Sequence, residues 1–310
     1  MRVRGERSWG LVCLSALLVA ACANDFTPRS VLEDLRVLAL RAKPLEVGPG
    51  ESVTLTPVRL ATPGETITEE HWSFCPFSVG GTAGFACAVP ACEFPLQPGG
   101  DPVDGVTPAD GVTVTADPGA LAEQCLALLA AQGGAPPSVP SELPAKVNTV
   151  FRYRAADSGG KTREAVQLVP FYLGGAPAER NLPPVIQEVD IGGQKVESGG
   201  TGPALGPGAQ LEFRVLLAPS SVQPYVDDAG RTVEETLVVS FFTTAGRFDF
   251  DRANVEFPDG PAASGRASVV LKYEDVRPED LEAEAQLWAV ATDLRGGEAV
   301  EGPFLVPVRR

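Results

Sequence analysis

The sequence predicts an all-β protein made of two tandem β-sandwich domains, the first of which carries a disulfide-bearing insertion with a short helix. Three observations support this fold class. The 310 residues include 33 Gly and 29 Pro, which separate many short Val-rich runs. Helical periodicity is confined to a few stretches. A series of sequence landmarks also occurs twice in the same order, which indicates two copies of one unit.

The duplication is clearest at turns and at the strands that follow them. In the first copy Gly48-Pro49-Gly50 precedes an alternating run at 52–55, and in the second Gly206-Pro207-Gly208 precedes another at 210–213. The later landmarks are Ser73-Phe74 with Ser240-Phe241, Ala155-Ala156-Asp157 with Ala291-Thr292-Asp293, and Gly159-Gly160 with Gly296-Gly297. Landmarks repeated in one order are expected from a tandem duplication.

Each copy is expected to contain about seven short strands. The first, third and two closing strands are predicted at 35–41, 71–75, 150–156 and 164–169 in copy one, and at 185–191, 237–242, 285–292 and 299–308 in copy two. The closing strands of each copy flank a Gly-Gly turn and form a hairpin. We place the first domain at 32–173 and the second at 185–310, with a Gly- and Pro-containing connector at 174–184.

This pattern resembles immunoglobulin-like and fibronectin type III-like sandwiches. Trp72, on the third predicted strand, resembles the core tryptophan of that fold. Neither copy has the cysteine pair that joins the second and sixth strands in true immunoglobulin domains. The resemblance therefore implies the architecture and not membership of the immunoglobulin family.

The first copy is longer than the second between its third strand and its closing hairpin. This insertion, at about 76–148, contains or adjoins Cys75, Cys87, Cys92 and Cys125. An even number of cysteines in an exported chain favours two disulfides, and we favour Cys87 with Cys92 and Cys75 with Cys125 among the three possible connectivities. Zinc is the alternative, but the spacings match no common zinc module.

The insertion is also expected to contain the short helix. Asp117 is predicted to cap it, Pro118 to begin it, and Gly133-Gly134 to end it. A bond from Cys125 to Cys75 would attach this helix to the end of the third strand.

The N-terminal residues have the order expected of an export signal. Arg2, Arg4 and Arg7 precede an apolar run from Leu11, and Val19-Ala20-Ala21 leads into Cys22. The run is too short to span a bilayer, which takes roughly 20 residues. These residues resemble a bacterial lipoprotein signal.

That resemblance implies removal of residues 1–21, lipidation of Cys22 with acyl chains such as palmitate, and a tether at 22–31. Several acyl chains make a durable anchor. Ala23, in place of an Asp, implies an outer-membrane position in the cell envelope. The alternative is ordinary secretory cleavage, which would release a soluble protein.

The net charge of −15 opposes binding to nucleic acid, because an acidic protein repels phosphate groups. The resemblance to a lipoprotein implies the membrane as one partner, through the N-terminal lipid, and the other expected partner is an unidentified envelope protein or glycan. No cofactor is expected.

One motif resembles a catalytic segment. Asp157-Ser158-Gly159-Gly160, with the single histidine His71 upstream, is similar to the nucleophile region of chymotrypsin-like serine proteases. We reject this interpretation because Leu294-Arg295 stands at the corresponding place in copy two, and a hairpin turn explains both copies. We therefore expect a non-enzymatic adhesin, scaffold or accessory binding module.

Two alternative functions depend on carboxylates. A hydrolase, for example one acting on carbohydrate, could use acids of the insertion such as Asp101, Asp104 or Asp110. A calcium-stiffened surface protein could use Asp249 and Asp251. Strand alternation would put those two carboxylates on one face and the rings of Phe248 and Phe250 on the other. The simpler interpretation of that face is a solvated strand.

A contact patch is predicted on the second copy. Aligning the closing hairpins puts Trp288 and Val290 on the outer face of their strand, where the first copy has Arg152 and Arg154. An exposed aromatic and a neighbouring valine would suit a partner protein. A bulge or shifted register that buries the indole is the other interpretation, and we favour it over the patch. The insertion and its Pro-rich exit, at 136–144, form a second candidate contact surface.

Overall fold

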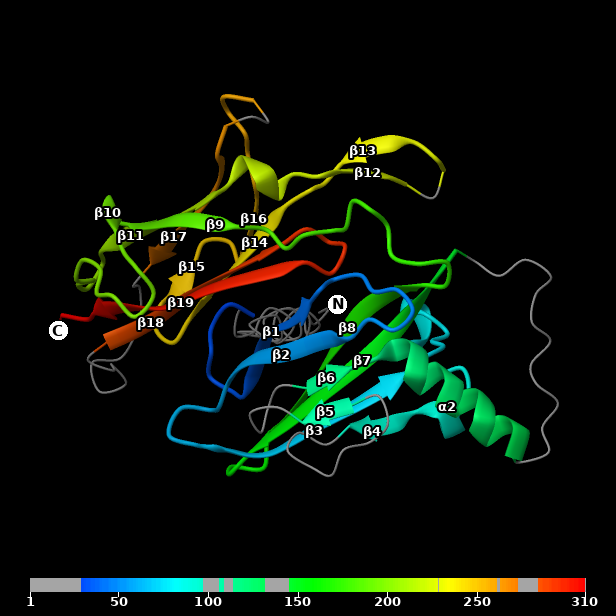
Figure 1. Cartoon of the computed structure of the whole chain (residues 1–310). Coiled ribbons are helices and arrows are strands. Elements are labelled where there is room, and N and C mark those ends of the chain that lie inside the picture. Colours follow the sequence, from blue (N-terminus) through cyan, green and yellow to red (C-terminus); the bar gives the residue numbers. More distant parts are fainter. Residues whose placement is uncertain are drawn as a thin grey trace, which may run out of the picture.

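The computed structural model describes residues 29–96, 106–108, 114–131, 145–227, 229–260, 263–272 and 284–309, and only the backbone of 106–108 (Figure 1). Several predicted features lie outside these residues. They are the lipidation site Cys22, the insertion carboxylates Asp101, Asp104 and Asp110, and the prolines at 136–144.

The first domain is a sandwich of two four-stranded antiparallel sheets. One sheet has the order β1 (Arg36–Lys43), β2 (Val53–Leu60), β6 (Val114–Ala116), β5 (Val106–Pro108). The other has the order β4 (Phe94–Leu96), β3 (Ile67–Cys75), β7 (Lys146–Asp157), β8 (Thr162–Tyr172). The predicted closing hairpin is β7 with β8.

The second domain, above the first in Figure 1, repeats this plan. Its five-stranded sheet has the order β10 (Gln194–Lys195), β9 (Ile186–Ile191), β11 (Gln210–Leu217), β17 (Gly265–Lys272), β15 (Arg247–Phe248). Its four-stranded sheet has the order β16 (Arg252–Asn254), β14 (Val238–Thr243), β18 (Glu284–Thr292), β19 (Glu298–Pro307). A separate hairpin, β12 (Pro224–Val226) with β13 (Thr232–Glu234), lies between β11 and β14 in the chain.

The strand order is that of an immunoglobulin-like sandwich, in which strands A, B, E and D form one sheet and C, F and G form the other. Strands β1, β2, β6 and β5 occupy positions A, B, E and D, and β4, β3, β7 and β8 occupy C′, C, F and G. Strands β9, β11, β17 and β14, β18, β19 repeat the A-B-E and C-F-G frame in the second domain. The predicted fold class is confirmed.

Each sandwich encloses its own aromatic core. In the first domain Trp72 is 2% exposed and packs on Tyr153 with ring centroids 4.8 Å apart. In the second domain Phe213 packs on Phe241 with centroids 5.3 Å apart. Alternating apolar residues of the facing sheets fill both cores, so Trp72 has the core position expected for it.

The insertion contains the predicted helix. Helix α2 (Pro118–Ala131) begins at Pro118, and Asp117 Oδ1 accepts hydrogen bonds from the amides of Gly119 at 2.8 Å and Ala120 at 3.2 Å. Among the described residues, short 3₁₀ helices lie in loops at η2 (Gly81–Ala83), η3 (Pro90–Cys92) and η4 (Pro219–Ser221). Within the described part of the chain, no helix has the length and apolar character needed to cross a membrane.

The predicted disulfide pairing is wrong. The bonds are Cys75–Cys87 and Cys92–Cys125, with Cα atoms 5.6 and 5.1 Å apart. The loop after β3 folds back on itself through an antiparallel bridge between Ser78 and Cys87, which brings Cys87 beside the end of β3. Pro90 begins helix η3, which places Cys92 against α2, where Cys125 is buried. The turn at Pro90 therefore does not join Cys87 to Cys92 as expected.

The two domains are joined by a third apolar cluster, which we call the seam. Its buried members are Leu32, Leu38 and Ala39 from the N-terminal part of the first domain and Trp288 and Val290 from β18. The chain before β1 also pairs with the second domain: Leu32 N donates to Thr243 O at 2.8 Å, and Thr243 N donates to Ser30 O at 2.8 Å.

The seam corrects the predicted contact patch. Trp288 and Val290 do face away from the core of their own sandwich, but they are 3% and 5% exposed because the first domain covers them. Strand β18 also has a register irregularity between Leu287 and Ala289, at the position of Trp288. The covering residues come from about 250 positions earlier in the chain, so local alternation alone could not reveal them.

Candidate functional site

A groove of about 1450 Å³ runs between the two domains, and we call it the interdomain groove. Its walls come from β7 and β8 of the first domain, the connector at 177–182, the segment at 220–227 around β12, and the β18–β19 turn at 292–298. Phe85 of the insertion also lines it. The groove exceeds the roughly 300–1,000 Å³ of ordinary small-molecule pockets.

Two loops of the second domain line the groove. The β12–β13 hairpin lies in the B–C connection, and the β18–β19 turn is the F–G loop. In antibody variable domains these two loops, with a third, form the binding surface at one end of the sandwich. Here both loops line a groove that the first domain closes on its other side.

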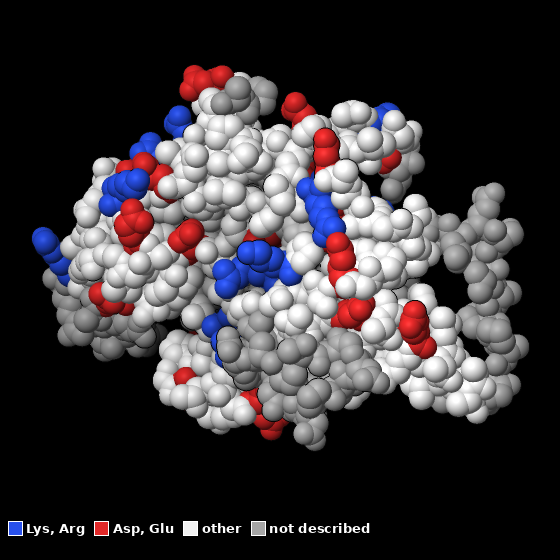
Figure 2. All heavy atoms as spheres, viewed as in Figure 1, with Lys and Arg blue, Asp and Glu red and all other residues white. Residues whose placement is uncertain are grey.

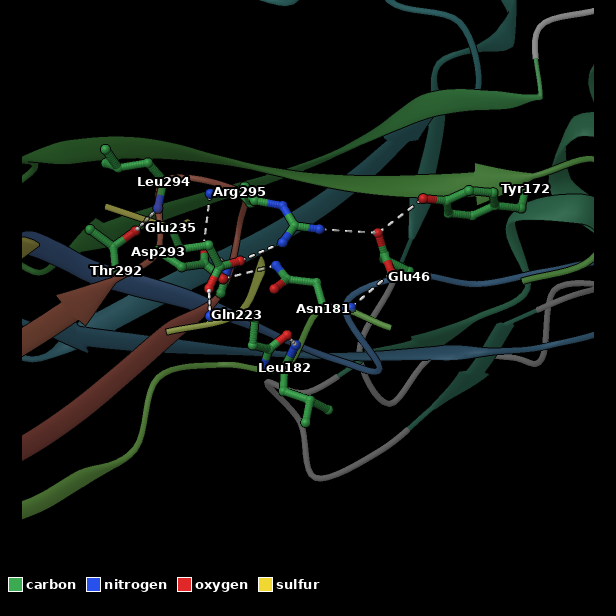
Figure 3. Close-up of polar contacts among 11 residues, drawn as sticks. Glu46, Tyr172, Asn181, Leu182, Gln223, Glu235, Thr292, Asp293, Leu294 and Arg295 are labelled. Carbon is green, nitrogen blue, oxygen red and sulfur yellow. Dashed lines mark hydrogen bonds and ion pairs between the residues drawn. The ribbon is translucent and has the colours of Figure 1, made fainter. Parts of the chain in front are cut away.

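Hydrogen bonds hold the connector in this groove, as Figure 3 shows. The backbone N–H of Asn181 donates to Glu46 Oε2 at 2.9 Å, and its side-chain Nδ2 donates to Asp293 Oδ2 at 2.8 Å. Arg180 forms an ion pair with Glu51 at 2.6 Å. The connector is therefore tied to both domains and does not act as a free linker.

Arg295 crosses the groove between the domains. Its guanidinium forms an ion pair with Glu235 of the second domain and reaches Glu46 of the first at 3.9 Å (Figure 3). It also stacks over Tyr225, 4.5 Å from the ring centroid. Glu46 accepts a hydrogen bond from the Tyr172 hydroxyl at 3.1 Å, and burial beside Glu46 raises the pKa of Tyr172 to about 12.

The duplicated Asp of the closing hairpin explains how the turn is built. Asp157 Oδ1 accepts the Lys161 amide at 2.9 Å, and Asp293 Oδ1 accepts the amides of Arg295 and Gly297 at 2.7 and 2.8 Å. The second carboxylate oxygen differs between the copies. That of Asp157 binds Thr62 within its own domain, whereas that of Asp293 binds the connector.

Two residues with unfavourable backbone conformations line the groove. Among the described residues, Phe85 and Leu294 are the non-glycine residues with positive φ, at 57° and 60°, and both line the groove from opposite domains. A bulky residue in this region costs about 1–2 kcal/mol. Sequence reasoning missed both residues, because neither Phe nor Leu is a typical left-handed residue.

Exposed apolar side chains gather at the same place. Leu182, Val226 and Leu294 are 60%, 66% and 65% exposed, and all three line the groove. They come from the connector, the β12–β13 hairpin and the β18–β19 turn. Exposed apolar side chains grouped on one surface are typical of a binding site.

Glu298 lies where β19 leaves the turn, and it also lines the groove. Its Oε2 accepts the Leu40 amide of β1 at 2.8 Å. Burial, with a further contribution from the charge of Asp293, raises the pKa of Glu298 to about 7, although the Leu40 hydrogen bond acts in the opposite direction. A carboxyl group that binds the first domain therefore titrates near neutral pH.

The calcium candidates do not lie as predicted. Strand β15 ends at Phe248, so Phe248 is buried and Phe250 is 67% exposed instead of sharing a face with it. Asp249 Oδ1 accepts the amides of Phe250 at 2.9 Å and Val270 at 2.8 Å, which gives it a structural role. The described residues contain no group of three or more His, Cys, Asp or Glu placed to hold a metal ion.

The protease-like motif forms the hairpin turn expected of it. The Ser158 hydroxyl accepts the Thr66 amide at 3.1 Å and is bound to Glu65. His71 lies on the exposed side of β3, 3.7 Å from Glu69. Each side chain is thus engaged with its own neighbours.

Figure 2 shows Lys, Arg, Asp and Glu interspersed on the face in view, with large uncharged areas between them. The acidic excess of the chain is therefore not collected into one patch on this face. Fold and groove together define a two-domain immunoglobulin-like β-sandwich protein whose interdomain groove is the candidate site.

No protein-family model matches the chain, and no curated protein sequence matches it. Solved structures similar to it include the D00-D0 domain of intimin, at 12% identity over 89% of this chain and 96% of that one, with a TM-score of 0.21. Murine CEACAM1b matches at 9% identity over 89% of this chain and 96% of its own, also with a TM-score of 0.21. The fold assignment follows from the strand order described above.

Proposed function

We propose that the protein is a non-enzymatic binding module of the cell envelope, held to a membrane by lipid on Cys22, and that the interdomain groove receives its partner. Two domains, three connecting segments and the insertion all contribute to this groove. The proposal makes the groove, and not the predicted Trp288 patch, the contact surface.

The observation that carries this proposal is the position of Phe85 and Leu294. Residues held in sparsely populated backbone conformations tend to occur at functional sites, where the surrounding structure enforces them. Here two large apolar residues with positive φ face one groove from two different domains. Core packing does not require Leu294, because its side chain is 65% exposed.

The base of the groove is rigid enough to present these residues. The Cys75–Cys87 disulfide closes the loop that carries Phe85, and Arg152 donates hydrogen bonds to the carbonyls of Gly84 and Phe85. Arg295, next to Leu294, is fixed by Glu235 and by stacking on Tyr225. A preorganised site loses less conformational entropy when a partner binds.

Leu294→Asp tests the groove. We would pan a phage-displayed library of random 12-residue peptides and, separately, an array of immobilised glycans against the full chain, then measure retained ligands on the variants. A charge at an apolar anchor should weaken groove ligands at least tenfold, since such anchors contribute about 2 kcal/mol or more.

Phe250→Asp is the matched control, because Phe250 is 67% exposed in the same domain and does not line the groove. It should leave binding unchanged. Ligands that bind wild type and Leu294→Asp equally, or the absence of any ligand that distinguishes the two, would refute the groove as the binding site.

The lipid anchor has its own test. Radiolabelled palmitate should be incorporated into the wild-type chain and not into Cys22→Ala, which should leave the membrane fraction. Unchanged fractionation of Cys22→Ala would contradict the anchor and leave the groove proposal intact.

A further inference from the structure

The interdomain groove has an unbalanced charge at its floor. Besides Glu298, the charged residues that line it are Glu46, Lys146, Glu179, Arg180, Asp227 and Arg295. Most of these are already paired. Arg295 forms ion pairs with Glu235 and Glu46, and Arg180 forms one with Glu51. Asp227 forms an ion pair with Arg231 at 2.6 Å. Lys146 lies over the Tyr172 ring, 6.0 Å from its centroid.

Glu298 has no such counter-charge, and neither has Asp293, which belongs to the same turn but does not line the groove. Among the described residues, no Lys or Arg forms an ion pair with either carboxylate. Glu298 accepts the Leu40 amide, and Asp293 accepts backbone amides of its turn and the Asn181 side chain. The Coulomb effect of Asp293 also disfavours the charged form of Glu298. The part of the groove around Glu298 therefore lacks a balancing positive charge.

A second acceptor at the floor also lacks a donor. Asn181 is 4% exposed and lines the groove, and its Oδ1 has no hydrogen-bond partner. Its Nδ2 is fixed on Asp293, so the orientation of the amide is set. A buried polar atom without a partner costs about 1–3 kcal/mol, and a ligand or a ligand-borne water that supplies a donor would recover part of it.

Other residues that line the groove have the opposite character. Phe85, Leu182, Val226 and Leu294 line the same groove with apolar side chains. The volume of about 1450 Å³ is greater than a single small metabolite needs and suits an extended segment of polypeptide. Apolar anchors give affinity in peptide recognition, and one complementary charge gives register.

From this complementarity, and on the basis of the proposed function, we infer that the groove binds an extended peptide segment whose Lys or Arg side chain is received by Glu298, with apolar neighbours seated on Leu294 and Phe85. The basic side chain supplies the missing positive charge. The flanking apolar side chains determine where the segment lies along the groove.

The affinity of the groove for such a peptide should depend on pH. A bound cation favours the charged form of Glu298, so binding should release a proton. Affinity should then rise with pH through neutrality. If the ligand binds only the charged form of a group that titrates near 7, the dissociation constant should fall about tenfold between pH 6 and pH 8.

The experiment uses the random 12-residue peptide library on the full chain and on Glu298→Gln. Wild type should enrich peptides with one fixed Lys or Arg between apolar residues, and Glu298→Gln should lose that position. For the best peptide, replacing the basic residue with norleucine should weaken binding at least tenfold on wild type and less than twofold on Glu298→Gln. The pH effect should disappear in the same variant.

Glu301→Gln is the matched control, because Glu301 lies on the same strand and outside the groove lining. Thermal melting of each variant confirms that it is folded. Peptides that are sensitive to Leu294→Asp but carry no basic residue, or whose affinity is unchanged in Glu298→Gln, would overturn the inference and leave the groove as a binding site. Groove-dependent glycans without such peptides would also overturn it. If no ligand of the full chain is weakened by Leu294→Asp, the proposed function itself is refuted.

Discussion

The carboxyl group of Glu298 affects both the stability of the fold and the candidate binding site. It accepts a hydrogen bond from β1 across the seam and also lines the candidate site. Its pKa is about 7 in the folded protein against 4.5 for an exposed Glu, so the folded state holds its proton more tightly than the unfolded state does. The contribution of Glu298 to the free energy of unfolding is fully present below pH 4.5 and is lost as pH rises through 7.

We therefore expect the free energy of unfolding to fall by about 2–3 kcal/mol between pH 5 and pH 8 on account of this group. Burial and the charge of Asp293 raise the pKa of Glu235 too, which adds an effect of the same sign. Glu298→Gln should remove most of this dependence and be more stable than wild type at pH 8. Urea unfolding at several pH values measures it.

Glu301→Gln should keep the wild-type dependence. An identical pH slope in Glu298→Gln and wild type would show that Glu298 does not titrate in this range.

Leu294 should show a trade-off between stability and binding. Asn tolerates positive φ better than Leu does, and the exposed Leu294 side chain contributes little packing. We expect Leu294→Asn to raise the free energy of unfolding by about 0.5–1 kcal/mol and to weaken groove ligands at least tenfold. Chemical denaturation and ligand titration on one preparation measure both. A destabilised Leu294→Asn would mean that the backbone is not strained there.

At the scale of elements, the two disulfides have different roles. Cys75–Cys87 closes a loop of 12 positions that carries Phe85, and Cys92–Cys125 closes 33 positions and fixes α2. The loop-entropy relation gives about 3 kcal/mol for the first and about 4 kcal/mol for the second.

Removing each bond in turn separates these roles. Cys75→Ser with Cys87→Ser should lower stability and weaken groove ligands, because the Phe85 loop is freed. Cys92→Ser with Cys125→Ser should lower stability more and change binding less. Denaturation and ligand titration test this, and mass spectrometry of unreduced peptides checks the pairing. Equal loss of binding in both variants would contradict the assignment of Phe85 to the site.

The elements that the sequence predicted well are those with a local physical signal. Alternating apolar residues located the strands, Gly-Gly turns located both closing hairpins, and Asp117 with Pro118 located the start of α2. Trp72 was also assigned correctly to the core, because a tryptophan on the third strand has few other uses in such a sandwich.

The features that it did not predict depend on contacts between distant segments. Spacing alone left three disulfide connectivities open, and the bridge between Ser78 and Cys87 decided among them. The burial of Trp288 depends on Leu32 and Leu38 in the other domain. The groove draws on the connector, both domains and the insertion, so no single stretch of sequence contains its pattern.

At the scale of the whole molecule, the seam and the groove join the domains into one unit. Apolar residues of β1 and β18 pack at the seam, and Asn181, Glu46, Asp293 and Arg295 link the connector to both sandwiches. The two domains should therefore unfold together.

Trp288→Ala should uncouple them. Truncating a buried aromatic costs about 3–5 kcal/mol, and the loss falls on the seam and not on either core. We expect one calorimetric transition in wild type and two in Trp288→Ala. Phe250→Ala, at an exposed position, should keep one. A single transition in Trp288→Ala at a lower temperature would indicate that polar contacts suffice to hold the domains together.

The bridge between Val31 and Thr243 determines how the molecule would bear a mechanical load. Tension applied through the residues that precede Arg29 would reach a strand of the second sandwich before it reached the first sheet of the first. Both sandwiches would then bear this tension at the same time, and not one after the other.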